Sequence, residues 1–417
     1  MSDPRFVLST TLLPWPANQG SRRFTLELAR SLLALGQVRW ISRAGMGSEL
    51  ARQRLESEGF EIRLDEEWAD LRALSRLRRR FSSSLRAWRE DVPRIQVFAC
   101  TQRMQEMVRE EVAADPKAIV VGPFWYQSAA VALGQAGRRV LVLSDLEYQR
   151  EAARLSRDPE GPLPRVAERL RRAEKDALLS CDALLCLTED DMRLADHALD
   201  TMPGAKRPAL GVWPAVVPVR ARPLNPAPRE PEAPQRWLCY GHWSAAFNRD
   251  GLVRFLQESW PAILRGIERP PELRVAGAGL GPKLRRVIEK AGAVAVGWVD
   301  ELETELAACD AVVVPLEYAG GLRYRMLEAQ AAGRPVICTP VAARGSGAEA
   351  RIHYLQAENP AEWARAWRFL EDPERSRKLA EAGYAFVRTH YGPDSRAERL
   401  RRVLEQSLGR EVLEARA

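Results

Sequence analysis

Short runs of apolar residues alternate with longer amphipathic stretches along most of the chain, and residues 311–340 show this alternation most clearly. The Val-rich run 311–316 predicts a strand that is buried on both faces. Residues 322–332 contain helix-forming residues without Gly or Pro, and a glycine and a proline separate them from a second apolar run at 336–339. This order predicts a strand–helix–strand crossover in a parallel sheet.

The same alternation recurs in both halves of the chain, so we expect an α/β fold made of two Rossmann-like, doubly wound domains. Between them, the proline-rich residues 203–235 show no period, which predicts an extended connector outside any core. We expect an N-terminal domain at 1–202, a second domain at 236–390 and a last helix within 391–417. The expected strands outside 311–340 are residues 6–13, 38–42, 117–121, 139–143, 182–187, 236–240, 273–276 and 294–296, and the expected helices are 21–35, 189–199, 360–370, 374–389 and 394–408.

The helix predicted at 322–332 and the turn before it contain candidate ligand-binding residues. Gly320 and Gly321 precede it, and the free N–H groups at a helix start attract phosphate. Gly321, Arg325 and Glu328 stand at i, i+4 and i+7, so we expect them on one stripe. With a diphosphate at the glycines, Glu328 can accept hydrogen bonds from ribose hydroxyls, and Arg323 and Arg325 can contact the phosphates. Spacing alone leaves a second interpretation open, an exposed Arg325–Glu328 pair on an ordinary crossover helix.

Other glycines and carboxylates follow predicted strands. Gly20 precedes the helix expected at 21–35, while Gly241 and Gly277 each end a strand of the second half. Such glycines serve either a ligand loop or simply a tight turn. Asp145 and Glu147 follow the strand expected at 139–143, where parallel sheets bind ligands. They are either site residues or a capping pair for the next helix.

Composition and charge limit the classes of protein and partner that fit the sequence. The chain of 417 residues is 46% hydrophobic and 29% charged, as expected for a folded two-domain protein. Six scattered cysteines suit reduced, buried positions, and four dispersed histidines form no metal motif. No apolar run approaches the length of a membrane span, so we expect a cytoplasmic protein. The formal net charge of +7 suits an anionic partner such as nucleotide phosphate.

Residues 71–88 form a separate feature. Apolar positions there follow a helical period, and arginines occupy the other faces. A basic amphipathic helix of this kind either binds an anionic membrane surface or packs its apolar face on the N-terminal domain. A nucleic-acid partner is not expected, because no stacking platform or nucleic-acid module is readable in the sequence.

The sequence GGLRYRMLEAQAAGRPVICTP, at residues 320–340, resembles the nucleotide-sugar signature of retaining, bacterial glycosyltransferases of family four with the GT-B fold. The run LLPWPANQGSRRF, the run SDLEYQREAAR and the order of segments from CYGHW to VVVPLE also resemble this family. The resemblance implies two Rossmann-like domains facing across a cleft, with the last helix crossing back to the first domain. It also implies that Glu328 binds the donor ribose.

The resemblance assigns further residues. It implies that Gly241 borders the donor phosphate, that the Gly20 loop faces the cleft and that the turn containing Val299 faces the base. Where many members of the family have an Arg and a Lys after the first glycine, this sequence has His242 and Arg249.

Two positions depart from the family pattern. Gly320 stands where many members have a glutamate near the transferred sugar, and Glu317 lies three residues away. Ser144 replaces a histidine that contacts the sugar, beside Asp145. The candidate catalytic residues are therefore Asp145 and Glu317.

The sequence as a whole predicts a glycosyltransferase that moves a sugar from a nucleoside diphosphate donor to a hydroxyl acceptor on a glycan, glycolipid or lipid-linked intermediate. We expect retention of configuration, no metal and no cofactor. The alternatives are a catalytically silent nucleotide-sugar-binding protein and a membrane-surface scaffold, the latter placed at the inner membrane face by residues 71–88.

Overall fold

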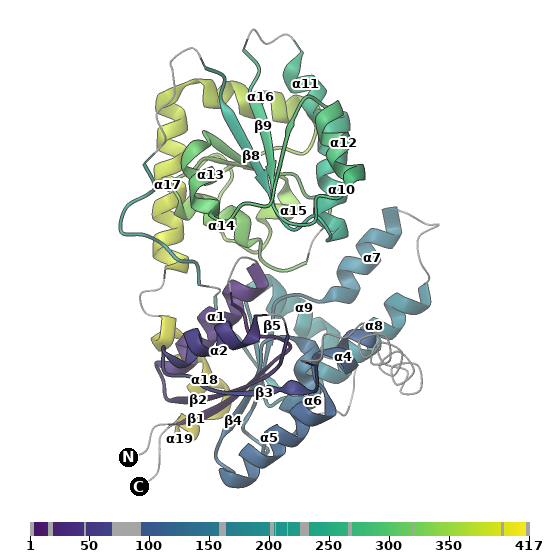
Figure 1. Cartoon of the computed structure of the whole chain (residues 1–417), viewed down its shortest axis with the longest axis vertical. Coiled ribbons are helices and arrows are strands. Elements are labelled where there is room, and N and C mark those ends of the chain that lie inside the picture. Colours follow the sequence, from purple (N-terminus) through teal and green to yellow (C-terminus); the bar gives the residue numbers. More distant parts are fainter. Residues whose placement is uncertain are drawn as a thin grey trace. The chain divides into compact units, whose positions relative to one another are not determined.

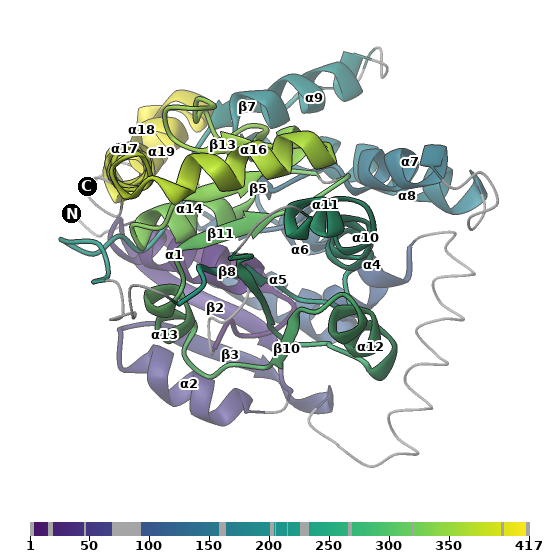
Figure 2. The ribbon, with the colours of Figure 1, turned by 90° about the horizontal axis from the view of Figure 1, so that it is seen from above.

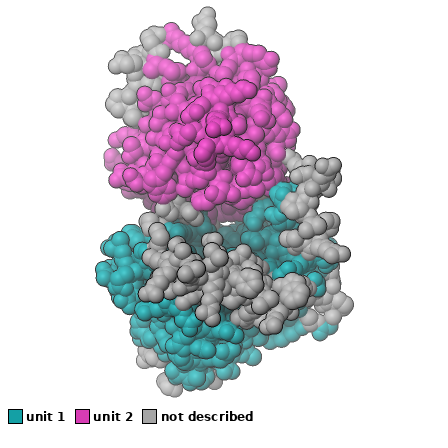
Figure 3. Space-filling model, turned by 45° about the vertical axis from the view of Figure 1, so that its right-hand side comes forward, with its two compact units in different colours: residues 1–214, 395–417 teal, residues 215–394 magenta. Residues whose placement is uncertain are grey.

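The computed structural model describes residues 4–15, 20–45, 47–68, 93–157, 164–200, 204, 206–214, 216–225, 233–265, 269–318, 320–392 and 396–413. It contains two compact units, coloured separately in Figure 3. Unit 1 is Met1–Pro214 with Ser395–Ala417, and unit 2 is Ala215–Asp394. The helix expected at 71–88 lies outside the described residues, so its role stays a prediction.

Unit 1 is built on a seven-stranded parallel sheet of order β3-β2-β1-β4-β5-β6-β7 (Figure 1). The order reverses between β1 and β4, so the sheet is doubly wound as predicted. The strands are β1 (Arg5–Thr10), β2 (Gln37–Arg43), β3 (Glu61–Asp65), β4 (Ile119–Gly122), β5 (Arg139–Leu143), β6 (Ala183–Cys186) and β7 (Ala209–Val212).

Helices accompany this sheet, and α7 and α8 lie side by side in both views (Figures 1 and 2). The described helices of unit 1 are α1 (Gly20–Leu33), α2 (Ser48–Glu56), α4 (Arg94–Ala99), α5 (Gln102–Ala114), α6 (Ser128–Val131), α7 (Glu147–Arg157), α8 (Pro164–Leu179), α9 (Glu189–Asp200), α18 (Arg396–Leu408) and α19 (Arg410–Leu413). Short 3₁₀ turns occur at Glu66–Trp68 and Trp125–Gln127.

Unit 2 repeats the design with a six-stranded parallel sheet of order β10-β9-β8-β11-β12-β13. Its strands are β8 (Arg236–Tyr240), β9 (Glu272–Ala276), β10 (Val294–Gly297), β11 (Ala311–Val314), β12 (Val336–Cys338) and β13 (Leu355–Gln356). Its helices are α10 (Ala246–Arg254), α11 (Trp260–Leu264), α12 (Pro282–Lys290), α13 (Leu302–Ala308), α14 (Tyr324–Ala331), α15 (Pro340–Ala343), α16 (Pro360–Glu371) and α17 (Pro373–Tyr391), and a π-helical turn at Phe255–Ser259 joins α10 to α11.

Large aromatic side chains fill the core of unit 2 between the sheet and the neighbouring helices. Trp237 on β8, Trp260 on α11 and Trp363 on α16 are almost completely buried in one cluster. Helix α17 follows α16 and runs in a clearly different direction (Figures 1 and 2). The turn between them is set by Asp372, whose side chain accepts hydrogen bonds from the N–H groups of Glu374 and Arg375.

Three strands of the structure are not predicted from the sequence: β3, β7 and β13. β7 lies within residues 203–235, which the sequence places outside any core, yet Trp213 directly after it is fully buried. The expectation is therefore wrong for Ala209–Trp213. The reason is that prolines on both sides of this strand leave too few residues for a readable period.

The last long helix returns to the sheet of unit 1. Leu400 and Leu404 on α18 are fully buried, and α18 packs against β6, β7 and α1. At its start, Arg396 pairs with Glu27 of α1 at 2.5 Å. Residues four apart lie on the same helical face, so one apolar stripe explains why this segment docks there.

All six cysteines are free and buried. In the described part of the chain, no three His, Cys, Asp or Glu side chains come together to hold a metal ion. None of the helices described in the structure has both the length and the apolar character needed to cross a bilayer.

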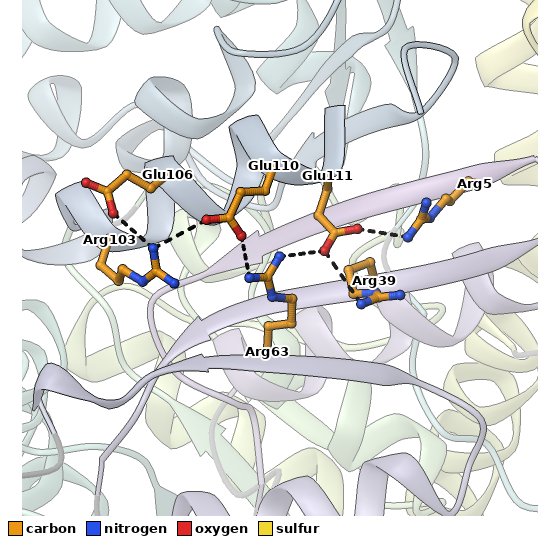
Figure 4. Close-up of polar contacts among 7 residues, drawn as sticks. All are labelled: Arg5, Arg39, Arg63, Arg103, Glu106, Glu110 and Glu111. Atoms are coloured by element: carbon orange, nitrogen blue, oxygen red, sulfur yellow. Dashed lines mark hydrogen bonds and ion pairs between the residues drawn. The ribbon is translucent and has the colours of Figure 1, made fainter. Parts of the chain in front are cut away.

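An ion-pair network lies between α5 and strands β1, β2 and β3 of unit 1 (Figure 4). Glu111 on α5 has a side chain only 7% exposed, and its carboxylate contacts Arg5 at 2.8 Å and Arg63 at 2.7 Å. Arg39 adds a third contact at 3.5 Å. Three arginines therefore surround one nearly buried carboxylate, which explains why these strands are less apolar than their neighbours.

Removing this carboxylate will destabilise unit 1. Glu111→Gln leaves three guanidinium groups without their shared anion, and we expect the local free energy of unfolding to fall by about 1.5–3 kcal/mol, the range for hydrogen bonds to charged groups. Hydrogen exchange of the amides in β1, β2 and α5 measures this loss. Glu106, on the same helix with a side chain 54% exposed, provides the control, since we expect Glu106→Gln to change the value by less than about 0.5 kcal/mol. Equal effects of the two changes would contradict this interpretation.

Candidate functional site

The candidate site in unit 2 lies where the strand order reverses, between β8 and β11. In open α/β sheets, ligands bind beyond the carboxyl ends of the strands at such a reversal. The loop after β8 contains Gly241 and His242, and the segment after β11 leads through Gly320 and Gly321 into α14. The sheet topology therefore brings together most of the residues that the sequence singles out.

Helix α14 begins at Tyr324, two residues later than predicted. Gly321 has a positive φ of 63° and stands ahead of the helix, so the predicted stripe of three residues is wrong for Gly321. Arg325 and Glu328 remain on the helix, three residues apart and on one face. Arg323 is the N-cap residue, and its side chain makes no capping hydrogen bond.

Arg325 is partly buried and points beneath the end of β8. Its Nη1 donates to the carbonyl oxygen of Tyr240 at 2.7 Å, and its Nη2 donates to Oδ1 of Asn248 at 2.6 Å. Burial lowers the pKa of Arg325, against the opposing influence of Cys239, Tyr240 and Glu328. The alternative of an exposed Arg325–Glu328 surface pair is therefore wrong, because this guanidinium lies inside the unit.

Glu328 is partly exposed on the next turn of α14. Its Oε2 lies 3.3 Å from the hydroxyl of Tyr240, which also lies 3.0 Å from the carbonyl oxygen of Arg325. A carboxylate offers about four acceptor positions, so it can accept more than one hydrogen bond. Tyr240 thus orients the carboxylate, and the sequence gives one signal for it, a hydroxyl at the end of an otherwise apolar strand.

Three glycine loops meet backbone to backbone at the carboxyl edge of the sheet. The N–H of Gly241 donates to Ala276 O at 3.1 Å, and the N–H of Gly277 donates to Gly297 O at 2.6 Å. Gly277 has φ 121°, and a Cβ added there would lie 1.9 Å from the carbonyl oxygen of Gly241. Only glycine fits this approach, because a side chain would overlap the neighbouring loop.

His242 and Arg249 are both exposed at the entrance to α10. The carbonyl oxygen of His242 accepts from Nδ2 of Asn248 at 2.9 Å, which ties the loop after β8 to the helix. Arg249 pairs with the neighbouring Asp250 at 3.1 Å, and the hydroxyl of Tyr318 donates to that carboxylate at 2.6 Å. The sequence predicts neither Asn248 nor Tyr318 as part of this arrangement.

The turn after β10 presents an aromatic side chain. Val299 is partly buried against the apolar cluster that contains Leu238 and Met326. Its neighbour Trp298 is 52% exposed, and the indole Nε1 donates to Asp300 at 2.9 Å. The exposed surface of this turn is therefore an indole ring, which the sequence analysis does not single out.

Glu317 lies in the segment between β11 and α14, where it is held in an ion pair. Its Oε1 accepts from Nη1 of Arg254 at 2.6 Å, and Arg254 also pairs with Glu258 at 2.9 Å. Hydrogen bonds to Glu258 and then Glu317 raise the pKa of Arg254. Arg323 donates through Nε to Gly321 O at 3.2 Å and lies 5.6 Å from the ring centroid of Phe247.

The candidates in unit 1 are Gly20 and Asp145. Gly20 is the first residue of α1. Asp145, between β5 and α7, accepts from Nη1 of Arg150 at 2.8 Å. The cap of α7 is a residue that the sequence analysis misses, since Glu174 of α8 accepts from the N–H groups of Glu147 and Tyr148 at 2.7 and 2.9 Å. Glu174 is fully buried, so the turn that follows Asp145 is anchored from inside.

Comparison with known proteins finds a matching protein family and solved structures with a similar fold. Residues 234–372 match the protein family described as glycosyl transferases group 1. The chain therefore carries a glycosyltransferase group 1 domain. This match contains Arg325, Glu328 and the three glycine loops of unit 2. None of the curated proteins matches the sequence.

Solved structures resemble the chain over nearly its whole length. HepE from Anabaena, in complex with UDP and glucose, has a TM-score of 0.65 at 12% identity, covering 97% of this chain and 99% of that one. Sucrose-phosphate synthase from Thermosynechococcus elongatus has a TM-score of 0.67 at 16% identity, covering 97% and 98%. A TarM mutant from S. aureus, in complex with fondaparinux, alpha-GlcNAc-glycerol and UDP, has a TM-score of 0.66 at 9% identity, covering 96% and 99%. Together with the two parallel sheets, this likeness confirms the predicted GT-B fold.

The contact between Gly277 and Gly241 predicts that a side chain at position 277 strongly destabilises the protein. Gly277→Ala combines an unfavourable positive φ with overlap on a backbone carbonyl, so we expect a loss of at least about 2 kcal/mol in the free energy of unfolding. Gly281, four residues on, provides the control because a Cβ there would meet nothing within 4 Å and its φ is −70°. Thermal melting of the two variants measures the difference, and an unchanged melting temperature for Gly277→Ala would contradict the packing described here.

The buried carboxyl of Glu174 predicts a pH dependence. Burial raises its pKa from the ordinary 4.5 to about 8, although the two backbone N–H groups act in the opposite direction. The folded state therefore binds a proton that the unfolded state releases, so stability from this group is present below pH 4.5 and declines as the pH rises to about 8. Free energies of unfolding at several pH values should show this decline in the native protein and a flatter profile in Glu174→Gln. A steeper decline in the variant would reverse the sign and contradict the assignment.

Proposed function

We propose that this protein transfers a sugar from a nucleoside diphosphate donor to a hydroxyl acceptor. The observation that carries the proposal is the position of Glu328 and Arg325 on one face of α14, at the strand reversal of unit 2 and beneath its glycine loops. These residues lie within the segment that matches the glycosyltransferase group 1 family. The position and the family match support the same function independently.

The proposed donor site assigns one part of the nucleotide to each group of residues. The diphosphate lies at Gly241, Gly320 and Gly321, where backbone N–H groups and the start of α14 favour negative charge. The ribose hydroxyls donate to Glu328, and the base lies toward the turn that contains Val299. The exposed indole of Trp298 in that turn supports an aromatic contact with the base.

Basic side chains are proposed to balance the charge of the departing diphosphate. His242 and Arg249 are exposed beside the Gly241 loop, and Arg323 lies between the glycine turn and α14. Groups fixed in place before the reaction stabilise a developing anion without reorganisation. Retention of configuration and independence from metal belong to this proposal, and transfer that persists in EDTA will test the second.

Glu317 and Asp145 stay the proposed catalytic residues. Glu317 is already engaged by Arg254, which fixes its carboxylate beside the glycine turn. Asp145 is similarly held by Arg150 at the carboxyl end of β5. Each is a carboxylate that can balance positive charge as the bond to the sugar breaks.

A binding protein without transfer activity is the second candidate. The observation that favours it is the pair of departures at Gly320 and Ser144, since neither position offers the side chain that many glycosyltransferases use to contact the sugar. A panel of UDP-, GDP- and ADP-sugars in thermal-shift measurements identifies the donor, because a ligand that binds the folded state raises the melting temperature. Release of nucleoside diphosphate with acceptor pools then separates the two functions. Binding without release would favour the second candidate, and no binding of any donor would overturn the proposal.

Glu328 gives the most direct mutational test. Glu328→Gln removes the charge from the proposed ribose contact, and we expect donor binding to weaken by about 1.5–3 kcal/mol, or roughly 10- to 150-fold in Kd. Isothermal titration calorimetry with the donor found in the panel measures the change. Glu381 is an exposed acid on α17 of the same unit, and Glu381→Gln should leave the Kd unchanged. An unchanged Kd for Glu328→Gln would reject the assigned role.

A further inference from the structure

We infer that Tyr240, Asn248 and Arg325 form a clamp that positions Glu328 and the Gly241 loop for the nucleotide. The inference rests on the proposed function and deepens it, because it names the residues that position the donor-binding groups without touching the donor themselves. The clamp joins the end of β8, the first turn of α10 and the first two turns of α14.

The contacts of the clamp run in both directions between Tyr240 and Arg325. The Arg325 side chain donates to the main-chain carbonyl of Tyr240 at 2.7 Å, and the Tyr240 hydroxyl lies 3.0 Å from the main-chain carbonyl of Arg325. Each side chain therefore holds the backbone of the other residue, which fixes the distance between β8 and α14. Tyr240 is only 6% exposed, so water does not compete freely for these contacts.

Asn248 extends the clamp to the loop after β8. It accepts from Arg325 Nη2 at 2.6 Å and donates through Nδ2 to the carbonyl of His242 at 2.9 Å. The carbonyls on both sides of Gly241 are therefore fixed, one by Arg325 and the other by Asn248. Asn248 is itself 6% exposed, and a buried amide that satisfies two partners is costly to replace.

The loop is shaped to accept the guanidinium. A Cβ added at Gly241 would lie 2.8 Å from Nη1 of Arg325, so the glycine allows the charged group to lie directly against the main chain. The positive charge then sits behind the backbone that is proposed to hold the phosphates. Its attraction for a diphosphate acts through the loop and requires no direct contact.

The clamp has two branches, and experiments can measure the effect of each branch on nucleotide binding separately. The hydroxyl branch leads from Tyr240 to Glu328 Oε2 at 3.3 Å and acts on the proposed ribose contact. The guanidinium branch leads from Arg325 and Asn248 to the Gly241 loop and acts on the proposed phosphate contact. A purely structural role would weaken the binding of every ligand equally. The clamp instead predicts that each branch weakens only the binding of ligands that carry the matching part of the nucleotide.

The test for the hydroxyl branch compares a nucleoside diphosphate with its 2′,3′-dideoxy analogue. UDP, GDP and ADP are titrated first by calorimetry, and the nucleotide that binds best is used in both forms. Tyr240→Phe should raise the Kd of the ribose form about five- to tenfold, as expected for one hydrogen bond, and leave that of the dideoxy form within about twofold. Tyr391→Phe is the matched control, since Tyr391 is also 6% exposed and its hydroxyl donates to the carbonyl of Ser346 at 2.8 Å.

The guanidinium branch is tested with Asn248→Ala. This change should raise the Kd of the ribose and dideoxy diphosphates by the same factor, and leave binding of the corresponding nucleoside, which has no phosphate, unaltered. Circular dichroism establishes that each variant is folded. If Tyr240→Phe does not fold, Asn248→Ala still decides the inference through the comparison of diphosphate with nucleoside.

The outcomes distinguish the inference from the function on which it rests. If the native protein binds none of the three diphosphates, the proposed function is wrong and the clamp has no ligand to position. If the native protein binds one of them but Tyr240→Phe weakens the ribose and dideoxy forms equally, or neither, the inference is wrong while the proposed function stands. Loss of nucleoside binding in Asn248→Ala would likewise show a general structural role and overturn the second branch.

Discussion

The guanidinium of Arg325 under the end of β8 is the contact on which the candidate site depends. An arginine presents several N–H donors in one rigid plane, so a single side chain reaches the main chain of β8 and the amide of Asn248 at once. The charge is removed from water, and burial alone would disfavour it. Its partners are carbonyl and amide oxygens already fixed by secondary structure, which is why a charge at this depth organises the unit rather than disrupting it.

The two units bury their polar groups in different ways. In unit 2 tryptophans fill the core beside the sheet, and polar contacts at the end of β8 join it to α10 and α14. In unit 1, β1, β2 and β3 each contribute an arginine to the carboxylate of Glu111, beside buried apolar residues such as Val7 and Ile41. The polar contacts described for unit 2 thus lie at the end of a strand, whereas those described for unit 1 attach a helix to the face of the sheet.

The sequence predicts the elements whose signals are local. Residues 139–143 and 236–240 coincide with β5 and β8, since continuous apolar runs between turn residues leave little ambiguity. β3 is missed because its five residues include only two apolar ones, Ile62 and Leu64, among charged residues, and the ion-pair partner of Arg63 lies 48 residues away on α5. In the candidate site, Arg325, Glu328 and the glycines are found from residue type and spacing. Tyr240 is not, since its role arises from a partner 85 residues along the chain.

Unit 2 is inserted into unit 1, between β7 and α18. A ribosome therefore delivers every strand of the first sheet, then an entire second domain, and only afterwards the helix that carries Leu400 and Leu404 onto β6 and β7. Throughout that interval the nascent first domain exposes apolar surface that nothing translated so far can cover, and such surface is prone to aggregation. The order of the chain thus makes completion of the first domain a late event in biosynthesis, because its covering helix is translated only after the whole of unit 2.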